Sequence, residues 1–163
     1  MSYDFYLCRV GPDEDAKAAV DAMIARLDNE DNTDDVFSQM QEEMWTRPGP
    51  SPLTQVPESP RLHLAQVLLA HDPRLQSFPL GPCIGLDGPV DGPGISLELY
   101  DDHVAVTLPY GKNSHEADSA FSEVWSLLRL LHSQGYVTYD PQLDRIVDLA
   151  HDQPQVLSRY IGT

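Results

Sequence analysis

The clearest pattern of apolar and polar positions lies between residues 95 and 109. On either side of Asp101 and Asp102 every second residue is apolar: Ile95, Leu97 and Leu99, then Val104, Val106 and Leu108. A period of two is that of a strand with one buried face, and a polar pair between two such runs is typical of a tight turn. The pattern predicts a β-hairpin over these residues, although Asp-Asp is a poorer turn than Asp-Gly.

Apolar residues at every third or fourth position predict helices in four further segments: 13–29, 35–44, 61–72 and 113–135. Proline just before residue 61 and again at residue 73 fits the two ends of the third helix. Gly135 fits the end of the last helix. This last helix has the most continuous apolar face, with Trp125 as its main core anchor; the face consists of Phe121, Val124, Trp125, Leu128 and Leu131.

Strands are expected near both ends of the chain, over residues 3–10 and 136–139, because β-favouring residues gather there. A long Gly/Pro-rich loop is expected over residues 78–94. Without the segment 30–94, the order of elements is βαββαβ, which is the ferredoxin-like pattern. We therefore predict one α+β domain over residues 1–163: a mainly antiparallel sheet with helices on one face, a ferredoxin-like core, and a helical and Gly/Pro-rich insertion at 30–94.

The charge balance narrows the choice of partners. The chain has 26 Asp and Glu against 10 Lys and Arg, a net charge of -16. Residues 13–43 alone hold eleven acids and two bases. A surface this negative repels nucleic acids and anionic lipid and attracts basic proteins, so we expect neither a nucleic-acid nor a membrane partner. Acidity that serves solubility alone is the alternative.

The two cysteines, Cys8 and Cys83, bear on the compartment. Their pairing is left open by the sequence. The first residues lack the basic and apolar regions of a signal peptide, and no stretch reaches the roughly 20 apolar residues of a membrane span. Two thiols without these signals favour a reducing compartment, so a cytoplasmic protein is expected.

Motifs with possible chemistry are few. Cys83 lies in a G-x-C-x-G motif at residues 81–85, but a nucleophile elbow needs a strand before it and a helix after it, and Pro82 and the later glycines argue against both. Residues 28–39 resemble a calcium loop, but Thr33 and Gln39 replace its required Gly and Glu. We therefore expect no catalytic residue, no cofactor and no metal site.

The turn at residues 140–142 (Asp-Pro-Gln) follows the last predicted strand. Proline after aspartate favours a turn, and aspartate caps such turns with its own side chain. We expect this turn to be structural and exposed, so that Asp140 remains available to a partner.

Both ends of the chain resemble small immunity proteins of bacterial polymorphic-toxin and interbacterial competition systems. The matching residues are Ser-Tyr-Asp at 2–4 and Tyr-Asp-Pro-Gln at 139–142, and the hairpin and last helix fit loosely. The resemblance covers roughly half of the chain and leaves residues 28–94 unmatched. It implies a non-enzymatic protein that binds and neutralises a cognate antibacterial toxin by blocking its active site. It does not identify the toxin.

An acidic inhibitor suits a basic toxin, since complementary charge speeds encounter. Nucleases are commonly basic because they grip phosphates, and a toxin that attacks nucleotides or NAD is the alternative. The predicted partner-binding residues are acids and aromatics of the acidic stretch together with the turn: Asp28, Glu30, Asp31, Asp34, Asp35, Phe37, Trp45 and Asp140. Two other functions stay open: a small hydrolase using His115, Glu116 and loop carboxylates, and an acidic adaptor or regulator of a basic partner.

Overall fold

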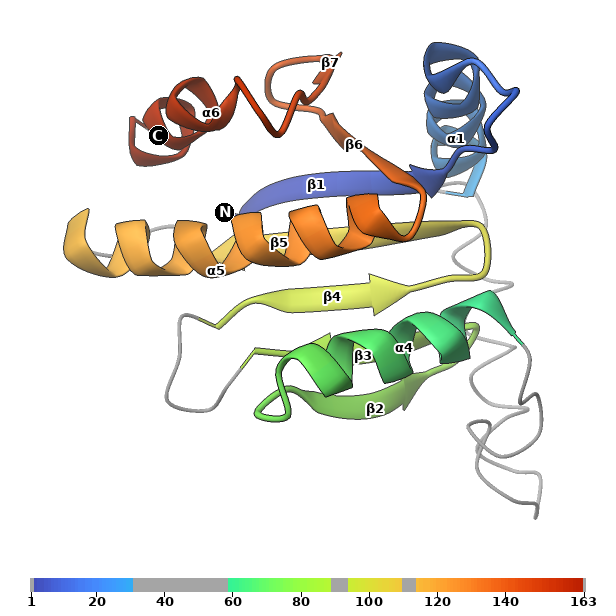
Figure 1. Ribbon diagram of the computed structural model, residues 1–163, viewed down its shortest axis with the longest axis horizontal. Helices are drawn as coiled ribbons and strands as arrows, with labels where there is room; N and C mark the ends of the chain where they lie inside the picture. Colours follow the sequence, from blue (N-terminus) through green and yellow to red (C-terminus); the bar gives the residue numbers. More distant parts are fainter. Residues whose placement is uncertain (1, 31–58, 89–93, 110–113, 163) are drawn as a thin grey trace.

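A computed structural model describes residues 2–30, 59–88, 94–109 and 114–162. These residues form a seven-stranded antiparallel sheet with the strand order β2-β3-β4-β5-β1-β6-β7. Four helices accompany the sheet (Figure 1). The predicted α+β class and the mainly antiparallel sheet are confirmed. The helix expected over residues 35–44 lies outside the described residues.

The middle of the sheet has the ferredoxin-like arrangement. Its strands are β1 (Ser2–Arg9), β4 (Ser96–Leu99), β5 (His103–Pro109) and β6 (Tyr136–Asp140). β5 lies between β1 and β4, and β1 lies between β5 and β6. Each strand–helix–strand unit is therefore split by a strand from the other unit. The predicted hairpin is β4 and β5, joined by a turn in which Tyr100 N–H donates to His103 O at 3.0 Å.

The Gly/Pro loop expected over residues 78–94 is wrong at its start. Residues there form the hairpin of β2 (Gln76–Leu80) and β3 (Cys83–Asp87), which extends the sheet beyond β4. The connecting residues are Gly81 and Pro82, and Gly81 has a φ of 64°. Glycine at the first central position is the requirement of a type II′ hairpin turn. Pro79 is tolerated because β2 is an edge strand.

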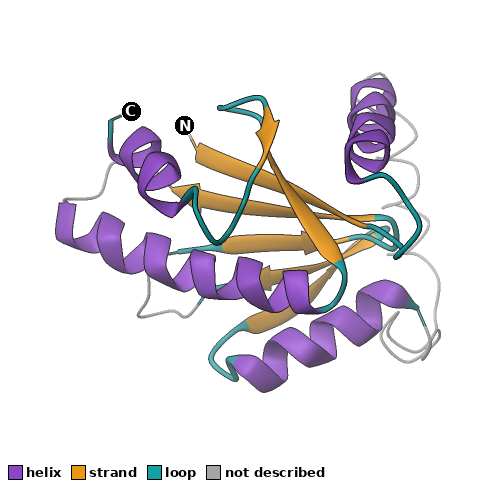
Figure 2. Ribbon diagram, turned by 45° about the horizontal axis from the view of Figure 1, so that its top comes forward, coloured by secondary structure: helices purple, strands orange, loops and turns teal. Residues whose placement is uncertain are grey.

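Three helices cover one face of the sheet: α4 (Pro60–His71), α5 (Ser114–Ser133) and α6 (Gln153–Ile161) (Figure 2). Under them lies the main core, built from the alternate apolar residues of β1, β3, β4 and β5. The expected apolar face of α5 is buried at all its positions: Phe121, Val124, Trp125, Leu128 and Leu131. α5 ends where predicted, because Gly135 takes a φ of 92° just beyond it.

The expectation that all helices share one face is wrong for the remaining helix. α1 (Ala16–Glu30) packs on the opposite face, where Val20 and Met23 bury a second, smaller core with Cys8. β1 makes this possible because both of its faces are apolar: Tyr3, Phe5 and Leu7 face the main core, while Tyr6 and Cys8 lie among the α1 contacts. The sequence shows two apolar rows in β1 but not which helix covers each.

Two short elements were not expected as such. β7 (Arg145–Ile146) pairs with β6, and α6 closes the main core with Val156 and Tyr160. The described part of the predicted insertion, residues 59–88, contributes α4, β2 and β3 to the same sheet and core. Within the described residues, no helix has the length and apolar character needed to cross a membrane.

Candidate functional site

The acidic stretch of the sequence begins on α1. Five carboxylates of α1 and the loop before it are exposed, against two exposed bases, Lys17 and Arg26; the five are Asp13, Glu14, Asp15, Asp21 and Asp28. Asp28 thus lies on the surface, as a partner-binding residue must. Glu30 ends α1, but its side chain lies outside the described part. Asp31, Asp34, Asp35, Phe37 and Trp45 also lie outside the described residues.

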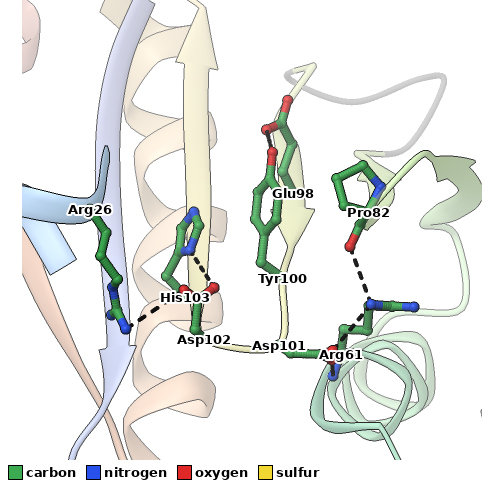
Figure 3. A network of polar contacts seen from close by, with 8 residues as sticks. All are labelled: Arg26, Arg61, Pro82, Glu98, Tyr100, Asp101, Asp102 and His103. Atoms are coloured by element: carbon green, nitrogen blue, oxygen red, sulfur yellow. Dashed lines mark hydrogen bonds and ion pairs between the residues drawn. The ribbon is translucent and has the colours of Figure 1, made fainter. Parts of the chain in front are cut away.

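A polar network at the β4–β5 turn brings together the two helices that flank this stretch in sequence (Figure 3). Arg61, in the first turn of α4, places Nη1 3.1 Å from Asp101 Oδ2 and 3.3 Å from Pro82 O. Arg26, in the last turns of α1, places Nη1 3.8 Å from Asp102 Oδ2. The described flanks of the acidic segment therefore meet at one end of the sheet.

The same turn carries an imidazole–carboxylate pair. His103 Nδ1 lies 2.8 Å from Asp102 Oδ1. Burial alone would raise the pKa of Asp102, but the hydrogen bond and charge of His103, with Arg26, lower that pKa below its usual value. The Tyr100 ring stacks on the His103 ring with centroids 4.3 Å apart, and its hydroxyl donates to Glu98 Oε2 at 3.1 Å. Sequence analysis missed this group. Its only signal in the sequence is that its members are polar residues of the hairpin and its turn.

Cys83 is not placed as a nucleophile. Its thiol donates to Leu80 O at 3.4 Å, and burial raises its pKa to about 11, so it is protonated at neutral pH. Residue 83 begins a strand, whereas a nucleophile elbow requires a helix after the cysteine. Cys8 and Cys83 are both free. They lie in β1 and β3, which two other strands separate, so they do not pair.

Asp140 corrects the expectation of an exposed turn residue. Its side chain is fully buried. Oδ2 accepts the Tyr3 hydroxyl at 2.6 Å, and Oδ1 accepts the N–H groups of Gln142 at 2.8 Å and Leu143 at 3.1 Å. Residues 140–142 do turn the chain at the end of a core strand, as predicted. Asp140 serves that turn, and a partner cannot reach it in the folded chain.

A cleft of about 380 Å³ between α4 and α5 holds polar groups that sequence analysis did not connect. His71 Nε2 lies 3.5 Å from Ser126 Oγ. A serine–histidine pair suggests acyl chemistry only with a third group that orients the histidine. The neighbouring carboxylate, Asp72, instead accepts Nε and Nη2 of Arg74, each at 3.0 Å. Among the described residues that line the cleft, none completes a nucleophile–base–acid set.

Of the two predicted hydrolase residues His115 and Glu116, only Glu116 has a described side chain. His115 is the second residue of α5, but its side chain lies outside the described part, while Glu116 is exposed in the first turn of that helix. Among the described residues, no three His, Cys, Asp or Glu side chains are arranged to hold a metal ion. No protein-family model matches the chain, and no curated protein sequence matches it.

Proposed function

We propose that this protein is a non-enzymatic immunity protein, which binds a cognate, basic antibacterial toxin in the cytoplasm and blocks its active site. The observation that carries the proposal is the exposed acidic surface of α1, which leads directly into the acidic segment at residues 31–58. The two buried, free thiols fit a reducing compartment.

The motifs behind the family resemblance also form a single unit in space. Tyr3 donates to Asp140, and the Gln142 side-chain nitrogen, turned toward its acceptors, reaches Asp140 Oδ1 at 2.9 Å and Asp4 O at 3.0 Å. The two motifs therefore stabilise each other through hydrogen bonds, which gives a structural reason why they occur together. The resemblance supports the proposal through fold, while the charge supports it through partner chemistry.

Growth rescue tests the proposed function. Open reading frames next to this gene are expressed alone and together with this chain. The proposal expects one neighbour to stop growth alone and to be tolerated with this chain, and the purified pair to form a stable complex. If no neighbour is toxic, or if protection needs turnover by this protein rather than stoichiometric binding, the proposal is wrong.

A further inference from the structure

The sheet face opposite α4, α5 and α6 carries a continuous row of side chains across five strands. The register places these residues side by side: Phe78, Gly85, Glu98, Ala105 and Tyr6. Neighbouring strands lie about 4.8 Å apart, so the row spans roughly 19 Å. Among the described helices, α1 alone packs on this face, and it covers the Tyr6 end. Ala105 is small, so few side-chain atoms stand beside Glu98 on the β5 side, while the Phe78 ring covers Gly85 on the β3 side.

Glu98 is a half-buried carboxylate whose charge is not matched within the described part of the chain. It accepts the Tyr100 hydroxyl, and no Lys or Arg of the described residues forms an ion pair with it. Two further acids of the strands on this face, Asp4 and Asp87, accept serine hydroxyls within the described part of the chain, from Ser2 at 3.2 Å and from Ser96 at 2.9 Å. Carboxylates held this way gain most from a cation that arrives with a partner.

Aromatic rings stand beside this carboxylate. The Phe78 ring lies over Gly85, where a Cβ atom would come 2.4 Å from its edge. The Tyr100 ring is fixed between its stack on His103 and its hydrogen bond to Glu98. A guanidinium group forms two hydrogen bonds with a carboxylate and stacks on aromatic rings, which an ammonium group does less well. The geometry of Glu98 and its neighbours fits arginine.

We propose that this face docks an arginine-bearing segment of the partner protein, with the guanidinium group on Glu98 and Tyr100. This inference rests on the proposed function for the identity of the partner, but not for the chemistry of the face. A second copy of this chain is a poor occupant because it carries the same net charge of -16. Anionic lipid and nucleic acid are repelled for the same reason.

Chemical-shift mapping of the full chain tests the proposal without the toxin. The probes are peptides of repeated Arg-Ser-Leu, Lys-Ser-Leu and Glu-Ser-Leu units at equal length. We expect the arginine peptide to shift the amides of Gly85, Glu98, Tyr100 and Ala105, and to bind about threefold more tightly than the lysine peptide. Glu98→Gln should weaken the arginine peptide about fivefold. Glu123→Gln is the control, since that carboxylate lies on α5 and faces Arg74.

Three results would overturn the inference: shifts confined to α1, equal affinity for the arginine and lysine peptides, or no effect of Glu98→Gln in a protein whose melting temperature is unchanged. Light scattering supplies the check against self-association through this face. The growth-rescue assay fails independently. If the face binds the arginine peptide but no neighbouring reading frame is toxic, only the immunity function is wrong. If Glu98→Gln loses peptide binding but still protects cells fully, only the proposal that the toxin docks on this face is wrong.

Discussion

Tyr3 and Asp140 are 137 positions apart in sequence and are joined by a buried hydrogen bond of 2.6 Å. Tyr3 belongs to the first strand and Asp140 ends the sixth, so this bond ties the start of the chain to the turn after β6. The Asp140 carboxyl group accepts two further backbone N–H groups from that turn. The residues that suggest an immunity protein therefore act here as structural supports.

Tyr3→Phe should destabilise the protein by about 1–3 kcal/mol, because it leaves a buried acceptor without its side-chain donor. Tyr139→Phe is the matched control: its hydroxyl donates at 2.7 Å to Asp144, but that contact is exposed. We expect the control to cost less than about 1 kcal/mol. Denaturant unfolding measures both. Equal losses would show that the Tyr3–Asp140 bond has no special structural weight.

Trp125 is the largest fully buried side chain of the core and stacks on Phe121 with centroids 5.2 Å apart. Trp125→Ala should cost about 3–5 kcal/mol through lost burial and a cavity. Trp125→Phe should cost less than half as much, because the indole Nε1 has no hydrogen-bond partner among the described residues. Ser122→Ala, at an exposed position of α5, should change thermal stability little. An unchanged melting temperature for Trp125→Ala would contradict the core described above.

Cys83 should be chemically inert in the folded state and should make stability fall at high pH. Its folded pKa of about 11 exceeds the ordinary thiol pKa of 9.0, so the folded state holds its proton to a higher pH than the unfolded state does. The stabilisation is complete below pH 9 and is lost as the pH rises through about 11. Disulfide-reagent labelling at pH 8 should be slow until denaturant is added. Cys83→Ala should reduce the pH slope and leave binding intact; fast labelling of native Cys83 would refute this.

The sequence predicts the elements with strong local periodicity and misses those that depend on particular contacts. The hairpin of β4 and β5 and the apolar face of α5 are readable because each has a continuous period. β2 and β3 cannot be predicted in this way, because Gly81, Pro82 and Gly85 are residue types typical of loops. A type II′ turn needs glycine at residue 81, and the Phe78 ring takes the space that a Cβ of residue 85 would fill.

The residues of the candidate site likewise include some that the sequence predicts and some that it does not. The exposure of Asp28 follows from helix phase, so sequence alone places it on the surface. Asp140 shows the limit of local reasoning: a turn aspartate is normally exposed, and only the distant Tyr3 hydroxyl accounts for its burial. Two ion pairs, Asp101 with Arg61 and Asp102 with Arg26, join three separate segments. Local sequence patterns do not predict such contacts.

Acidic residues at the end of α1 and beyond should steer a basic toxin to this protein. Steering should raise the association rate above about 10⁵–10⁶ M⁻¹s⁻¹ and toward about 10⁸ M⁻¹s⁻¹ at low salt. Salt should slow association, because the Debye length falls from about 30 Å at 0.01 M to about 10 Å at 0.1 M. Dissociation should change less.

Stopped-flow association with the cognate toxin across a salt series is the most direct measurement. It compares the natural chain with a variant in which five acids are made neutral: Asp28, Glu30, Asp31, Asp34 and Asp35. A control variant neutralises Glu116, Asp118 and Asp148, and rates are compared per charge removed. We predict a slower rate and a shallower salt slope for the first variant and a smaller change for the control. Equal rates and equal salt slopes for the natural chain and the five-acid variant would show that these acids do not steer the toxin.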